Sequence, residues 1–137
     1  MKKNLDEQKV NVRIKLAALW TAFMFLYIYV DYFALYMPGK INDILNGRVF
    51  TFDITQTFIF TALFLAVIPI LMIFLSVVMK AKASRLVNMI VAALLIPYML
   101  FNLTGEAWPH MYFAAAVEVV MLALIIRYAH NWPTQQK

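Results

Sequence analysis

Two acidic side chains interrupt long apolar runs of this sequence. Asp31 lies inside the stretch YIYVDYFALYMPG (27–39), and Glu118 lies inside the run that follows Pro109. A charged side chain within a membrane costs at least about 2.5–3.5 kcal/mol on insertion scales, so an acid in such a run is a candidate functional residue. The chemistry open to a sheltered pair of carboxyl groups is to carry a proton, to bind a cation, or to hold a cationic organic ligand.

The role of the two acids depends on what compensates their charge. No Lys or Arg lies in the interior of the apolar runs. The carboxyl groups are therefore protonated, share one proton, or hold a cation in a water-filled cavity. A further alternative is that Lys40 or Arg48, which lie in the loop after the first run, folds inward. The residues alone leave these alternatives open.

Polar neighbours favour a binding site around the two acids. Tyr27 precedes Asp31 by one helical turn, so the two lie on one face and the tyrosine hydroxyl can donate to the carboxylate. Asn102, near the end of the third apolar run, can add a polar group from another helix. We therefore predict four ligand-binding residues: Asp31, Glu118, Tyr27 and Asn102. The alternative is that these groups, like Asn88, only join helices by hydrogen bonds.

Other chemistries lack the residues that they need. The chain has no cysteine, which excludes disulfides, thiolate metal sites and cysteine nucleophiles. The two histidines, His110 and His130, fall at opposite ends of the last apolar run, so they cannot form one metal site. No nucleophilic triad, phosphate-binding loop or dinucleotide fingerprint is visible. We expect no catalytic residue, no metal and no cofactor, and hence no enzyme.

The composition places these residues in a membrane protein. Of the 137 residues, 64% are hydrophobic and 14% are charged, against about 45–50% and about 25% in a soluble globular domain. A membrane-spanning helix needs about 20 predominantly apolar residues. Four runs fit this length: 16–37, 54–79, 86–103 and 109–128. We predict an all-α fold, an antiparallel four-helix transmembrane bundle, formed by one integral membrane domain over residues 1–137 with the lipid bilayer as its partner.

Basic residues set the predicted orientation. With four spans, both termini and the second loop share one side, which carries ten Lys and Arg residues, whereas the other side carries only Lys40 and Arg48. Cytoplasmic loops carry the excess of Lys and Arg, so both termini are predicted to be cytoplasmic. Asp31 and Glu118 then lie about 9 Å and about 13 Å below the outer surface, in the outer half of the bilayer. The same bias explains the net charge of +5 without nucleic-acid binding, which we do not expect.

The first apolar run resembles a group of small bacterial integral membrane proteins of unknown function. That group shares the pattern LW…Y-x-Y-x-D-x-x-x-L-x-x-PG within a compact four-span chain. Seven positions of this sequence fill the pattern: Trp20, Tyr27, Tyr29, Asp31, Leu35, Pro38 and Gly39. The resemblance implies a location in the bacterial cytoplasmic membrane, and it implies no substrate, cofactor or catalytic residue.

Together these features favour a small membrane protein that binds or transports a proton, a cation or a cationic small ligand. Asp31 and Glu118 would carry this ligand, and Tyr27 would tune them. Four short helices enclose little volume, so a permeation path would require a homo-oligomer. The alternative is a non-transporting accessory or structural subunit whose polar residues only specify helix packing.

Overall fold

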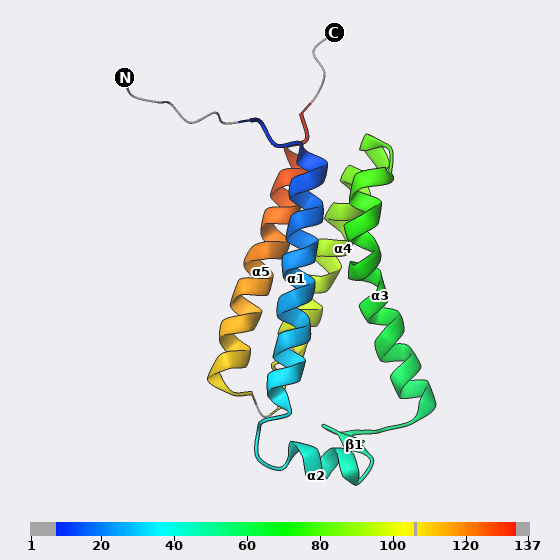
Figure 1. The fold of residues 1–137 in the computed structure, drawn as a ribbon, viewed down its shortest axis with the longest axis vertical. Coiled ribbons are helices and arrows are strands. Elements are labelled where there is room, and N and C mark those ends of the chain that lie inside the picture. Colours follow the sequence, from blue (N-terminus) through cyan, green and yellow to red (C-terminus); the bar gives the residue numbers. More distant parts are fainter. Residues whose placement is uncertain (1–7, 106, 134–137) are drawn as a thin grey trace, which may run out of the picture.

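The computed structural model describes residues 8–105 and 107–133 (Figure 1). Four long helices dominate it: α1 (Val12–Ala34), α3 (Gln56–Val78), α4 (Ala81–Phe101) and α5 (Pro109–His130). Each is long and apolar enough to cross a membrane. Consecutive helices run in opposite directions, so the predicted all-α, antiparallel four-helix bundle is confirmed (Figure 1). Lys2, Lys3 and Lys137, which contribute to the charge bias, lie outside the described residues.

Two helices start earlier than the apolar runs predict. α1 starts at Val12 rather than at residue 16, and its cap Asn11 accepts a hydrogen bond from the Arg13 amide at 2.9 Å. α4 starts at Ala81 rather than at residue 86. Polar residues continue both helices because the backbone hydrogen bonds form whatever the hydropathy of the side chains. At its other end α1 stops at Ala34, three residues before the predicted end of the span.

One end of the bundle, here called the terminal end, holds the start of α1, the turn between α3 and α4, and the end of α5. The Arg13 guanidinium donates to the carbonyl oxygens of Val77 and Met79, both at 2.6 Å. The Lys15 ammonium lies 5.3 Å from the centroid of the Tyr128 ring. Arg13 therefore marks the side of α1 that faces α3, and Lys15 marks the side that faces α5.

The opposite end, here called the hairpin end, holds the other two connections. Between α1 and α3 lie a short helix and two short strands: α2 (Lys40–Leu45), β1 (Arg48–Val49) and β2 (Phe52–Asp53). The strands pair antiparallel, with Arg48 opposite Asp53. Phe50, in the turn between them, has φ 57°, and its ring lies against Gly105 in the α4–α5 connection, where an added Cβ would overlap it. This contact joins two loops that are distant in sequence.

A polar network fixes the helices in the half of the bundle near the terminal end. The Trp20 indole N–H donates to Asn88 Oδ1 at 2.7 Å, which joins α1 to α4. The Ser76 hydroxyl lies 2.6 Å from the Met72 carbonyl oxygen and 3.0 Å from Asn88 Oδ1, which adds α3. The Asn88 amide donates to the Ser84 carbonyl at 2.8 Å. Trp20, Ser76, Ser84 and Asn88 are fully buried, so Asn88 acts here as an interhelical hydrogen-bonding group.

The first half of α3 is separated from the other long helices, and only its second half packs in the bundle. Its buried residues begin at Pro69 and all lie in the second half. Between 56 and 65 every residue except the half-buried Phe58 is exposed. Ala62 and Leu65 precede Pro69 by seven and four residues, so they continue the face that packs further along the helix. Figure 1 shows α3 diverging from α1 toward the hairpin end, and Pro69, which has no N–H for the Leu65 carbonyl, lies where the separation begins.

Candidate functional site

Glu118 lies on the inner face of α5. Ala114, Ala115, Leu122 and Ile125 share this face and are buried with it. The two alanines stand four and three residues before Glu118, and small residues at this spacing let a neighbouring helix approach closely. The Glu118 side chain is only 5% exposed, yet within the described residues it makes no hydrogen bond and no ion pair. The carboxyl oxygens are not fully enclosed, but a largely buried carboxyl group without a hydrogen-bond partner is still costly.

Asp31 lies on the inner face of α1, but it is exposed. Trp20, Met24, Tyr27 and Asp31 follow one another at spacings of four, three and four, which keeps them on one side of the helix. Arg13 stands 18 residues before Asp31, which is five turns, so both lie along one line of α1. Arg13 on this side bonds to the end of α3, whereas Trp20 and Tyr27 interact with α4, so this side of α1 faces α3 and α4.

The sequence predicted a sheltered Asp31, but the residue is exposed in the structure. The separation of α3 from α1 explains the difference. The face of α3 that would cover Asp31 carries Ala62 and Leu65, and both are exposed. Asp31 also lies closer to the helix end than predicted. α1 stops at Ala34, so the carboxylate is three residues, or about 4.5 Å, from the end of the helix rather than about 9 Å. Glu118 is nine residues into α5, which is about 13 Å from the start of the helix.

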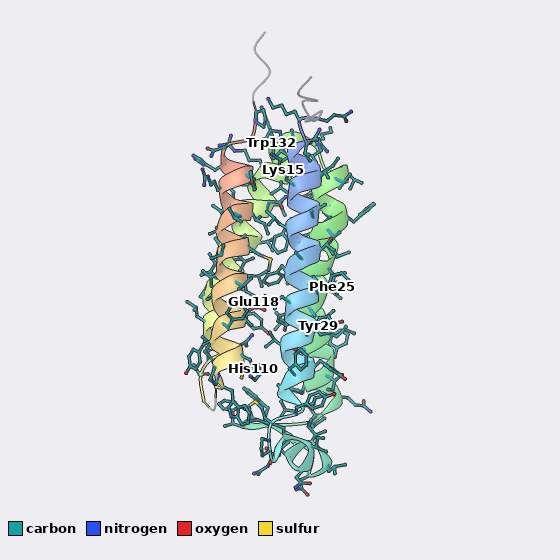
Figure 2. All side chains as sticks on the ribbon, turned by 60° about the vertical axis from the view of Figure 1, so that its left-hand side comes forward. Lys15, Phe25, Tyr29, His110, Glu118 and Trp132 are labelled. Carbon is teal, nitrogen blue, oxygen red and sulfur yellow. The ribbon has the colours of Figure 1, made fainter. Side chains whose placement is uncertain are left out.

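The two acids come from the first and last long helices. The Asp31 and Glu118 carboxyl groups and the Tyr27 phenol lie within electrostatic range of one another. In Figure 2 Glu118 and Tyr29, which is two residues from Asp31, lie at similar heights in the bundle, with Lys15 at the far end. Tyr27 is within electrostatic range of both acids, and it precedes Asp31 by one helical turn.

Aromatic packing holds Tyr27 in place. Its ring is stacked on that of Phe23, with the centroids 6.2 Å apart and the planes 20° apart. Its side chain interacts with Tyr98 of α4, and both tyrosines pack against the buried core. The group therefore contains side chains from α1, α4 and α5, whereas the first half of α3 is separated from them.

Asn102 does not join this group in the structure. It follows α4 directly as the cap of the helix, and its backbone N–H bonds to carbonyl groups of the last turn. The residue is exposed, and its side chain makes no hydrogen bond with Asp31 or Glu118. Sequence position alone placed it near the predicted site, because the end of the third run lies at the same end of the bundle.

His110 is a polar residue of this region that the sequence reasoning did not select. It lies in the first turn of α5, two turns before Glu118, and its Nε2 atom is buried without a hydrogen-bond partner in the described structure. Its ring stands edge-on to Trp108, with the centroids 6.4 Å apart. Figure 2 shows it nearer the hairpin end than Glu118. The sequence signal that could have selected His110 is its spacing of eight residues from Glu118, which places both residues on a similar side of α5.

The site combines acidic and aromatic side chains. Two carboxyl groups and the phenols of Tyr27 and Tyr98 meet where the neighbouring helix segments contain no Lys or Arg. Within the described residues, no three His, Cys, Asp or Glu side chains are arranged to hold a metal ion. Such a group suits a proton or a cation that is held by two acids and an aromatic surface rather than by a closed ligand shell.

Comparison with known proteins places the chain in a family. A model of a family of unknown function, DUF6326, matches residues 3–137. The chain belongs to DUF6326. No curated protein and no solved structure gave a match. Membership of DUF6326 confirms the resemblance to a family of unknown function. The four apolar helices indicate a membrane protein.

Proposed function

We propose that this protein binds a proton, a cation or a cationic small ligand at the site of Asp31 and Glu118. One observation carries the proposal: Glu118 is 5% exposed, has no hydrogen-bond partner among the described residues, and lies within electrostatic range of a second carboxyl group from another helix. Leaving two such acids uncompensated is costly in a bilayer, and a positive occupant offsets that cost. The polar network around Asn88 needs no occupant, because its members satisfy one another.

The location is part of the same proposal. The excess of Lys and Arg at the terminal end favours a cytoplasmic position for that end. The site then lies in the outer half of the bilayer, toward the hairpin end, in the bacterial cytoplasmic membrane. An occupant would enter from the outer side or from the outer leaflet.

Binding is better supported than transport by a single chain. Below the site, Trp20, Ser76, Ser84 and Asn88 are fully buried and hydrogen-bonded to one another or to backbone. This layer is fully buried and lies between the site and the terminal end in the described part of the chain. Transport would therefore use a homo-oligomer, whereas ligand binding needs one chain only.

Thermal unfolding of the purified protein tests the proposal. Ligands that bind only the folded state raise its stability, by about 2.7 kcal/mol at 100 times the dissociation constant. We expect at least one of K⁺, Mg²⁺, tetramethylammonium and tetraphenylphosphonium to raise the melting temperature of protein in lipid nanodiscs. Asp31→Asn and Glu118→Gln should abolish this rise. Asp43→Asn, which changes an exposed acid of α2, should keep it.

A second function is favoured by the exposed first half of α3. A helix with apolar residues exposed all round fits a partner helix as well as lipid, so the chain is alternatively an accessory subunit. In that case no cation stabilises the wild-type protein. Asp31→Asn and Glu118→Gln then change only stability or assembly, and this outcome would count against the binding proposal.

A further inference from the structure

We propose that the occupant of the site is an apolar organic cation, an amine or quaternary ammonium carrying a hydrophobic body, which reaches Asp31 sideways from the bilayer between α1 and α3. This inference rests on the proposed function and names its ligand class and route. It stands on three features of the molecule: the open side of Asp31, the apolar residues along that side, and the aromatic surface at Tyr27.

The open side of Asp31 faces lipid. Asp31 is exposed on the side of α1 that faces α3 and α4, and the first half of α3 is separated from the bundle. Leu65 is 38% exposed and Ala62 is also exposed, although both continue the packed face of α3. In a bilayer, the space beside these residues is filled by acyl chains. Asp31 is therefore reachable by a molecule dissolved in the membrane.

The residues along this route are apolar. The face of α3 toward the bundle carries Phe58, Ala62 and Leu65, and no Lys or Arg occurs between residues 49 and 79. A hydrated inorganic cation would lose its water shell without replacement on such a path. A hydrophobic cation already resides in the membrane interface and keeps its apolar body in contact with apolar groups along the whole path.

The inner part of the site suits the charged head of such a molecule. Glu118 is buried and without a hydrogen-bond partner, and Asp31 and Tyr27 stand beside it. The stacked rings of Tyr27 and Phe23 present aromatic surface next to the two acids. Aromatic rings attract organic cations through the ring quadrupole, most effectively where water is excluded. The same groups offer a metal ion too few ligands, since no three-residue metal cluster occurs among the described residues.

Two carbodiimides, which modify carboxylic acids, test the route on the wild-type protein in liposomes. Dicyclohexylcarbodiimide dissolves in the bilayer, whereas its analogue with a charged tertiary amine stays in water. Peptide mass spectrometry locates the modified acids. We expect the lipid-soluble reagent to modify Asp31 first, and the water-soluble reagent to modify Asp43 and Asp53, which are exposed in the hairpin end. Modification of Asp31 by the water-soluble reagent at the rate of Asp43 would overturn the lateral route.

Binding of two cations of equal charge tests the ligand class. Tetraphenylphosphonium has a large apolar body and tetramethylammonium has almost none. We expect tetraphenylphosphonium to bind the protein in nanodiscs at least about tenfold more tightly, a difference of about 1.4 kcal/mol. Ala62→Phe, which adds a ring on the face of α3 toward Asp31, should weaken this binding by about tenfold. Ala116→Phe adds the same ring on the exposed face of α5 and should leave it unchanged.

The outcomes separate the two proposals. Equal affinity for both cations, or equal effects of Ala62→Phe and Ala116→Phe, would overturn the lateral route and the apolar ligand while leaving a cation site in place. Absence of any saturable cation binding that depends on Asp31 and Glu118 would overturn the proposed function itself. Helicity and elution volume of each variant show whether it is folded, and the carbodiimide arm needs no variant at all.

Discussion

At the scale of the residue, Asn88 and Glu118, two of the four buried polar residues of the described structure, differ in their hydrogen bonds. Asn88 is satisfied by Trp20, Ser76 and Ser84, so its polarity is used within the protein. Glu118 is as buried but finds no hydrogen bond in the described structure. Burial of a polar group is tolerated when its partners come with it. The contrast therefore assigns a structural role to Asn88 and makes Glu118 the residue on which the proposed binding site depends.

The structural role of Asn88 gives a prediction. Asn88→Ala removes the acceptor of the Trp20 indole N–H and leaves that donor buried without a partner, which costs about 1–3 kcal/mol. We expect a loss of this size in the free energy of unfolding, measured by denaturant titration in mixed micelles. Asn102→Ala is the matched control, because Asn102 is exposed and should change stability by less than about 0.5 kcal/mol. Equal losses of unfolding free energy in the two variants would show that the buried hydrogen bonds of Asn88 do not stabilise the bundle.

At the scale of the element, α3 shows what the sequence can and cannot predict. Its length and its apolar composition predicted a spanning helix, and the structure contains one. Its separation from α1 was not predictable, because residues 56–65 are apolar around most of the helix and carry no stripe that marks a packed side. For the same reason Asp31 was expected to be sheltered. The spacing of Tyr27 and Asp31 placed them on one face of α1, but it could not show whether α3 covers that face.

The loops at the hairpin end are fixed by a glycine, which gives a second prediction. Gly105 has φ 96°, and the Phe50 ring occupies the space of its missing Cβ. Gly39 has a similar φ of 87° but nothing within 4 Å of the same position. Alanine at either position has an unfavourable positive φ, which lowers the free energy of unfolding by about 1 kcal/mol. Only Gly105→Ala also displaces the ring.

Thermal unfolding of the two glycine variants separates these effects. We expect Gly105→Ala to lower the melting temperature more than Gly39→Ala. Adding Phe50→Ala to Gly105→Ala should recover the difference, because the small side chain no longer overlaps the new methyl group. Equal melting temperatures for Gly105→Ala and Gly39→Ala would show that the Phe50 contact does not hold the two loops together.

At the scale of the whole molecule, one end of the bundle is closed and the other is open. The terminal end combines the Arg13 bonds to α3 with the fully buried network around Asn88. Toward the hairpin end α3 separates and Asp31 is exposed, while Glu118 stays buried on the inner face of α5. The four helices were predictable because hydropathy reports on lipid contact. The asymmetry of the bundle was not, because it depends on how four helix faces fit one another.

Because the two ends of the bundle differ, the orientation of the molecule decides which side of the membrane the proposed site faces. The chain has no cysteine, so single introduced thiols can measure this orientation. Asn46→Cys and Ala83→Cys each place one thiol in an otherwise thiol-free chain, at exposed positions of the hairpin end and the terminal end. Neither change alters a charge, so the bias of Lys and Arg that determines insertion is preserved. With the terminal end in the cytoplasm, a membrane-impermeant maleimide should label Asn46→Cys in intact cells and Ala83→Cys only after permeabilisation. The reverse pattern would place the two acids in the inner leaflet, and the ligand would then have to be sought among cytoplasmic cations.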